Sequence, residues 1–165
     1  MTSTAENRSY ILPLAFATTV SMWAIAYFCR LPVVMAPSWL AAGLMLGMVA
    51  LWGWVTGSRA NGGWLGGLLV GGVAAILNLL ILGSLLIPED GGSVLPSAVW
   101  WVPGSILAIA LVSGGFSAAF GKAARETPAS DWTALFSNVA VAATFLLVVA
   151  GGLVTSNEAG LAVVD

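Results

Sequence analysis

The chain alternates between long apolar runs and short polar segments. A transmembrane helix needs about 20 apolar residues, and five runs reach that length: Tyr10–Phe28, Val33–Thr56, Gly63–Ile87, Ser97–Phe120 and Trp132–Val154. A membrane β-barrel would show short alternating segments instead of continuous runs. Because backbone groups in lipid must be hydrogen bonded internally, the pattern predicts an all-α polytopic integral membrane protein with five transmembrane helices.

Composition supports this class. Hydrophobic residues make up 59% of the chain and charged residues 7%, whereas a soluble domain carries roughly 25% charged residues. The expected partner is therefore the lipid bilayer, and no nucleic-acid partner is expected. The first run could alternatively be a cleaved signal peptide, but Arg30 follows it directly and no small-x-small cleavage site follows its end. We therefore expect a retained helix.

Charge placement predicts the orientation, because loops rich in Lys and Arg stay on the cytoplasmic side. An inside N-terminus places Arg8, Arg59, Lys122 and Arg125 inside and leaves only Arg30 outside. Five helices then place the C-terminus outside. Tryptophans are expected to mark the membrane interfaces: Trp39, Trp100 and Trp101 the outer one, and Trp52, Trp54, Trp64 and Trp132 the inner one. The weakly basic N-terminus favours a bacterial cytoplasmic (inner) membrane over the mitochondrial inner membrane.

Polar groups within the runs point to function in membrane proteins because their burial is costly. None of the five runs has an Asp, Glu, Lys, Arg or His in its interior, which argues against a proton relay, an ion pathway or half of a transporter. Asn78 is the main polar side chain, with Ser105 and Thr144 as weaker companions, and we expect it to form an interhelical hydrogen bond. Cys29 is expected to be a packing residue, and Pro103 is expected to kink or unwind the fourth helix.

Small residues recur at helical spacing in the second and third runs. Gly43-x-x-x-Gly47 and Gly63-x-x-x-Gly67-x-x-x-Gly71 would let two helix backbones approach closely. This spacing predicts a tight hairpin between these two helices, joined by a loop over residues 57–62. The longest polar interruption, residues 121–131, is the one plausible domain boundary.

The C-terminal segment carries a more specific motif. It combines Gly-Gly-Leu at a helix end, Glu-Ala-Gly-Leu at a fixed distance, and a final acidic residue: Gly151, Gly152, Leu153, Glu158, Gly160, Leu161 and Asp165. This arrangement resembles the end of the first membrane helix and the following outer loop of the heme A synthase family, which assembles cytochrome oxidase. Residues 132–165 would then begin a heme A synthase-like domain, and residues 1–121 would form a four-helix extension before it.

The resemblance implies an oxidoreductase that hydroxylates a heme O methyl group, with heme b as prosthetic group and electrons supplied from the membrane. The family's heme is ligated by histidines in later helices, and these 165 residues contain no histidine. The sequence therefore predicts no catalytic, cofactor-binding or metal-binding residue of its own, and we expect the remaining catalytic helices to come from elsewhere. The alternative is a small non-enzymatic membrane subunit that packs in a respiratory or assembly complex.

Overall fold

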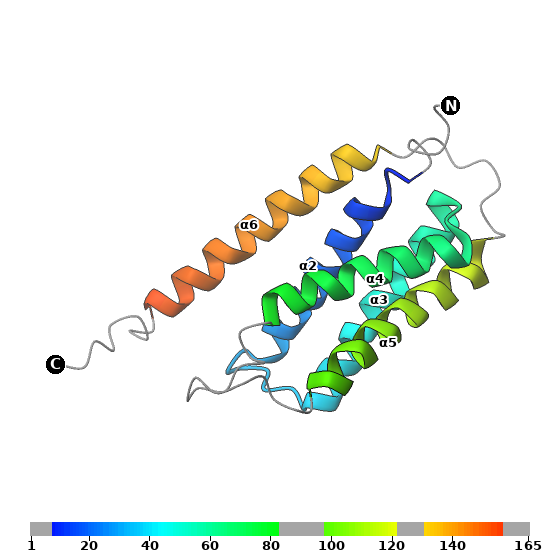
Figure 1. Cartoon of the computed structure of the whole chain (residues 1–165). Coiled ribbons are helices and arrows are strands. Elements are labelled where there is room, and N and C mark those ends of the chain that lie inside the picture. Colours follow the sequence, from blue (N-terminus) through cyan, green and yellow to red (C-terminus); the bar gives the residue numbers. More distant parts are fainter. Residues whose placement is uncertain (1–7, 83–97, 122–130, 157–165) are drawn as a thin grey trace.

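A computed structural model describes residues 8–82, 98–121 and 131–156 of the chain. These parts form five helices, and no strand is found among them. The helices are α2 (Ile11–Cys29), α3 (Ser38–Ala60), α4 (Gly63–Leu82), α5 (Ala98–Phe120) and α6 (Trp132–Ser156). Each is long and apolar enough to cross a membrane, which confirms the all-α membrane class. Helices α2 to α5 form a bundle, and α6 lies along one side of it (Figure 1).

The helix limits differ most from the predicted ones in α3. The run was expected to become helical at Val33, but α3 begins at Ser38, directly after Pro37 at its N-cap. Pro37 itself is extended, with a ψ of 145°, and a proline disfavours helical conformation in the residue before it, so the helix begins after Pro37. At its other end α3 continues past Gly57 and stops at Asn61, whose left-handed φ of 51° ends the helix. The expected loop over residues 57–62 is thus mostly helix.

The closest helix contacts involve α5. A Cβ atom built on Gly71 of α4 would lie 2.8 Å from the Ala110 Cα atom, and one on Gly53 of α3 would lie 2.6 Å from the Ser113 carbonyl oxygen. Both distances are shorter than real side chains tolerate, so only glycine permits these approaches. Gly57 and Gly67 continue the same pattern against α5. The backbones of α3 and α4 therefore pack directly onto α5, as expected of small residues at membrane helix interfaces.

This arrangement corrects the predicted glycine interface. Gly43 and Gly47 are exposed on α3, with no atom within 4 Å of the position where a Cβ would lie. Gly67 and Gly71 do form a tight interface, but with α5 instead of α3. Of the five glycines that the spacing picked out, only Gly67 and Gly71 approach another backbone closely, since Gly63 is open as well, and the spacing did not identify the partner helix.

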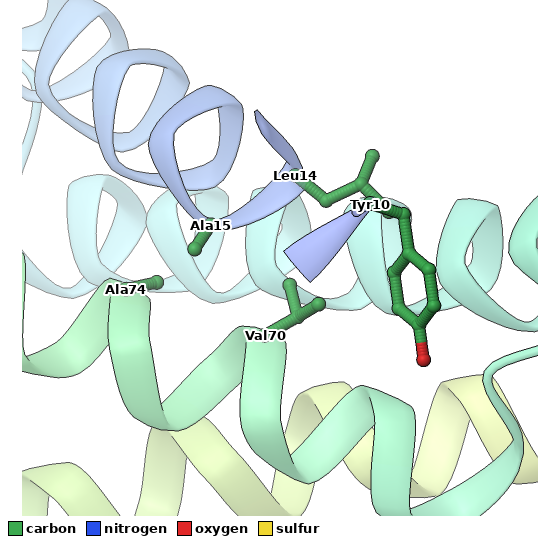
Figure 2. Close-up of a cluster of buried hydrophobic side chains, with 5 residues drawn as sticks. All are labelled: Tyr10, Leu14, Ala15, Val70 and Ala74. Atoms are coloured by element: carbon green, nitrogen blue, oxygen red, sulfur yellow. The ribbon is translucent and has the colours of Figure 1, made fainter. Parts of the chain in front are cut away.

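Helices α2 and α4 meet through a small apolar core (Figure 2). Leu14 and Ala15 of α2 are fully buried against Val70 and Ala74 of α4, and Tyr10 closes the end of this cluster. The Tyr10 ring extends towards the start of α4, where its hydroxyl would lie 2.5 Å from a Cβ built on Gly66. Burial raises the pKa of the Tyr10 hydroxyl, and the charge of nearby Arg8 lowers it in part, so the hydroxyl remains protonated at neutral pH.

Helix α5 runs without interruption through Pro103. The locally unwound turn that proline was expected to cause is absent from this helix. Pro103 is the sixth residue of α5, so only the first turn precedes it and few helical hydrogen bonds can be lost.

The glycine contacts predict opposite effects of one substitution at two sites. Gly71→Ala should lower the free energy of unfolding by about 1–3 kcal/mol, because its new methyl group overlaps α5. Gly47→Ala, the matched control, should be neutral or stabilising by up to about 1 kcal/mol, since alanine favours helix and the site is open. Unfolding of the two variants in lipid bicelles measures both values. Equal destabilisation at the two positions would contradict the packing described here.

Candidate functional site

A polar network ties α2 to its neighbours within the apolar bundle. Asn78 of α4 is buried, and its Oδ1 atom accepts a hydrogen bond of 2.8 Å from the Trp23 indole of α2. Its Nδ2 atom donates to the Ala74 carbonyl at 3.1 Å and faces the Met22 sulfur at 3.6 Å. The interhelical hydrogen bond predicted for Asn78 is therefore present, and both ends of its amide are engaged.

A second indole links α2 to α3. The Trp52 Nε1 atom donates to the Ser21 hydroxyl at 3.0 Å. Trp52 was expected at the inner membrane interface, but this bond places its ring against the middle of α2. Trp52 is half-buried, and an indole withdrawn from water usually has a hydrogen-bond partner, which Ser21 provides. Trp39, Trp100 and Trp101, in contrast, are exposed close to helix starts, as expected of interfacial residues.

The other two polar residues singled out in the sequence bond within their own helices. Ser105 donates to the Val102 carbonyl at 2.9 Å, and Thr144 donates to the Ala140 carbonyl at 2.9 Å. Sequence analysis missed Ser117, whose hydroxyl donates to the Gly63 carbonyl at 2.6 Å and joins α5 to α4. Its spacing of four residues from Ser113 on one face of α5 is the signal that could have found it.

Helix α6 packs chiefly against α2, with which it runs parallel (Figure 1). Two aromatic pairs hold the first halves of the helices together: Tyr10 with Trp132, whose ring centroids are 6.1 Å apart, and Phe16 with Phe136, at 5.1 Å. Asp131 directly precedes α6 and caps its first turn: its carboxylate accepts a hydrogen bond of 2.9 Å from the Ala134 backbone N–H. The positive end of the helix dipole also stabilises a carboxylate at this position.

The opposite face of α6 is uncovered. Val141, Phe145, Val148 and Gly152 follow one another at intervals of four, three and four residues, which places them on one side of the helix. The three large side chains are 67–70% exposed, and no atom lies within 4 Å of a Cβ position at Gly152. From Val141 to Gly152 this face is apolar, and it is available to lipid or to another helix.

The second half of α6 borders a cavity of about 490 Å³ beside α2. We call this space the α2–α6 cavity. It is lined by Phe16, Thr19, Val20, Trp23, Ala24 and Tyr27 of α2, Ile81 of α4, and Ala143, Leu146, Leu147 and Ala150 of α6. Its surface is almost entirely apolar.

The resemblance motif is described only in part. Gly151, Gly152 and Leu153 lie in the last two turns of α6 and are exposed. Glu158, Gly160, Leu161 and Asp165 fall outside the described residues, and so do Lys122 and Arg125 of the predicted inner loop.

Met22, Tyr10 and Cys29 do not fit as ligands for heme iron. Axial ligands to heme are His, Cys, Met or Tyr. Met22 faces the Asn78 amide, and Tyr10 is packed against Gly66. Cys29 is buried at the end of α2, and no group of three His, Cys, Asp or Glu residues occurs among the described residues. We therefore assign no chemical step on heme to these helices.

Comparisons with known proteins leave the family open. The chain matches no protein-family profile, no curated protein and no solved structure.

The Asn78–Trp23 hydrogen bond predicts coupling between the two residues. Replacing either one, as Asn78→Leu or Trp23→Phe, should lower stability, and the coupling between them in a double-mutant cycle should be about 0.6–2 kcal/mol. Thr144→Val is the control, because that hydroxyl bonds only within α6 and should show no coupling to Trp23. Unfolding titrations in bicelles provide the four free energies. Strict additivity of the Asn78 and Trp23 changes would contradict a bond between them.

Proposed function

We propose that the chain is the N-terminal membrane module of a heme A synthase-like protein. In this role α2 to α5 form a membrane-embedded support, and α6 is the first helix of the catalytic domain. The observation that carries the proposal is the position of α6: it touches the bundle on one side only, exposes an apolar face and ends in the Gly151-Gly152-Leu153 motif. A helix that belongs to a second domain requires such a free face.

The residues present decide which part of the function this chain could perform and which part its partner helices would perform. The chain has no histidine, so heme b and its ligands would lie in the partner helices that pack on α6. The resemblance implies that those helices oxidise a methyl group of heme O. The present helices would position α6 and its outer loop for that assembly.

A non-enzymatic membrane subunit is the second candidate. It is supported by the same uncovered face of α6, together with the absence of ionisable side chains from the helix interiors. Both candidates use α6 as the contact helix. They differ in whether the protein that covers α6 carries heme.

We further propose an inside N-terminus in a bacterial cytoplasmic membrane, from the distribution of Lys and Arg. Alkaline phosphatase fused after Asp165 should then be active, and the enzyme fused after Arg59 or Arg125 should be inactive. The same fusions scored with a cytoplasmic reporter should give the inverse pattern. Activity after Arg59 combined with inactivity after Asp165 would overturn this orientation.

Photo-crosslinking tests the function. A photoreactive amino acid at Val141, Phe145 or Val148, in the protein expressed from its natural gene neighbourhood, should crosslink α6 to helices that copurify with a Soret absorbance. The matched control is Leu107 of α5, which is 59% exposed and should yield lipid adducts only. Crosslinks from α6 to a protein that carries no heme would support the non-enzymatic subunit instead. Lipid adducts alone at all three α6 positions would contradict both functions.

A further inference from the structure

We propose that the α2–α6 cavity binds one acyl chain of a membrane phospholipid. Its volume of about 490 Å³ lies within the range of roughly 300–1,000 Å³ found for small-molecule sites. The site rests on the membrane-spanning helices alone and is independent of the proposed catalytic partner.

The shape of the cavity suits a chain. Its α2 wall consists of residues spaced by three or four positions, from Phe16 to Tyr27, so it follows one face of the helix. At a rise of about 1.5 Å per residue this wall is roughly 16 Å long. The Phe16–Phe136 contact lies at one end, and the cavity extends from there towards the ends of both helices. An elongated space parallel to membrane helices matches a lipid tail that lies along the bilayer normal.

Between Phe16 and Ala24 the lining offers a ligand no free hydrogen-bond donor. The Thr19 hydroxyl donates to the Ala15 carbonyl at 3.0 Å, and the Trp23 indole donates to Asn78 at 2.8 Å. These groups therefore have no hydrogen left to offer a ligand. A polar group placed there would lose its own hydrogen bonds at a cost of several kcal/mol, whereas a hydrocarbon chain loses none.

The cavity is continuous with the surface that faces lipid. Leu147 is 73% exposed and Ile81 is 52% exposed although both line it. A chain can therefore enter sideways from the bilayer without any helix moving. Tyr27, which is 39% exposed, lies at the end of the α2 wall. A tyrosine there suits the level of the headgroups, since its ring is apolar and its hydroxyl favours water.

Native mass spectrometry of the full chain in detergent, with added palmitoyl-oleoyl-phosphatidylcholine, tests the site. The wild type should retain one phospholipid per chain at detergent concentrations that remove all others. Ala143→Phe should reduce that retained fraction at least tenfold, because its ring fills the cavity. Ala142→Phe adds the same ring to the neighbouring exposed position, outside the lining, and should leave the retained lipid unchanged.

Fluorescence provides a second test that needs no cavity variant. Phospholipid brominated on its acyl chain should quench the fluorescence of Trp23, which is obtained as the difference between wild type and Trp23→Phe. This quenching should saturate at a low mole fraction of brominated lipid. Equal lipid retention by Ala143→Phe and Ala142→Phe, or quenching of Trp23 that only follows the bulk mole fraction, would overturn the site. Displacement of the brominated chain by farnesol but not by unlabelled phospholipid would overturn the acyl-chain assignment in favour of an isoprenoid.

Discussion

The direct backbone contact of α5 with α3 and α4 is the interaction on which the rest of the structure depends. Helices in lipid gain little from burying apolar side chains, because the lipid is equally apolar. They must gain packing contacts instead, and these increase as the backbones approach. Gly53 and Gly57 on α3, with Gly67 and Gly71 on α4, remove the side chains that would hold α5 away.

Helix α2 joins this glycine-packed core to α6. It is attached to α4 by the Leu14 and Val70 contact and by the Trp23–Asn78 hydrogen bond. Its other side presents Phe16 to α6. The two sides differ in kind: small buried residues and satisfied polar groups face the core, whereas large aromatic rings face α6. The aromatic pairs hold α6 to α2 only at one end of the two helices. The α2–α6 cavity lies beyond that end, where these contacts are missing.

The apolar runs predicted the number and class of the helices well, because length and hydropathy alone decide whether a segment can span a membrane. The interhelical bond of Asn78 was also predictable, since an unpaired amide is costly in lipid. The helix against which each glycine packs was not predictable. Gly43 and Gly71 look alike in the sequence, and only the three-dimensional arrangement shows that one is open and the other is against α5. Gly57 was predicted to be a loop residue, but the structure packs it against α5.

Of the candidate site, only the residues of the C-terminal motif were predicted from the sequence. Gly151, Gly152 and Leu153 were placed at a helix end, where the structure has them. The uncovered face of α6 was not foreseen. All sides of a transmembrane helix are apolar, so periodicity does not separate the face that meets lipid from the face that meets protein. The α2–α6 cavity was missed because its lining comes from three helices far apart in the sequence.

The central claim is that α2 to α5 form one cooperative unit and that α6 is attached to it more weakly. Pulling a single molecule by its two ends with magnetic tweezers, in a bicelle, measures this directly. The account predicts two separate extraction steps: α6 leaves first at the lower force, and α2 to α5 then unravel together at a higher force. Extraction of all five helices in one step, or loss of α5 before α6, would contradict it.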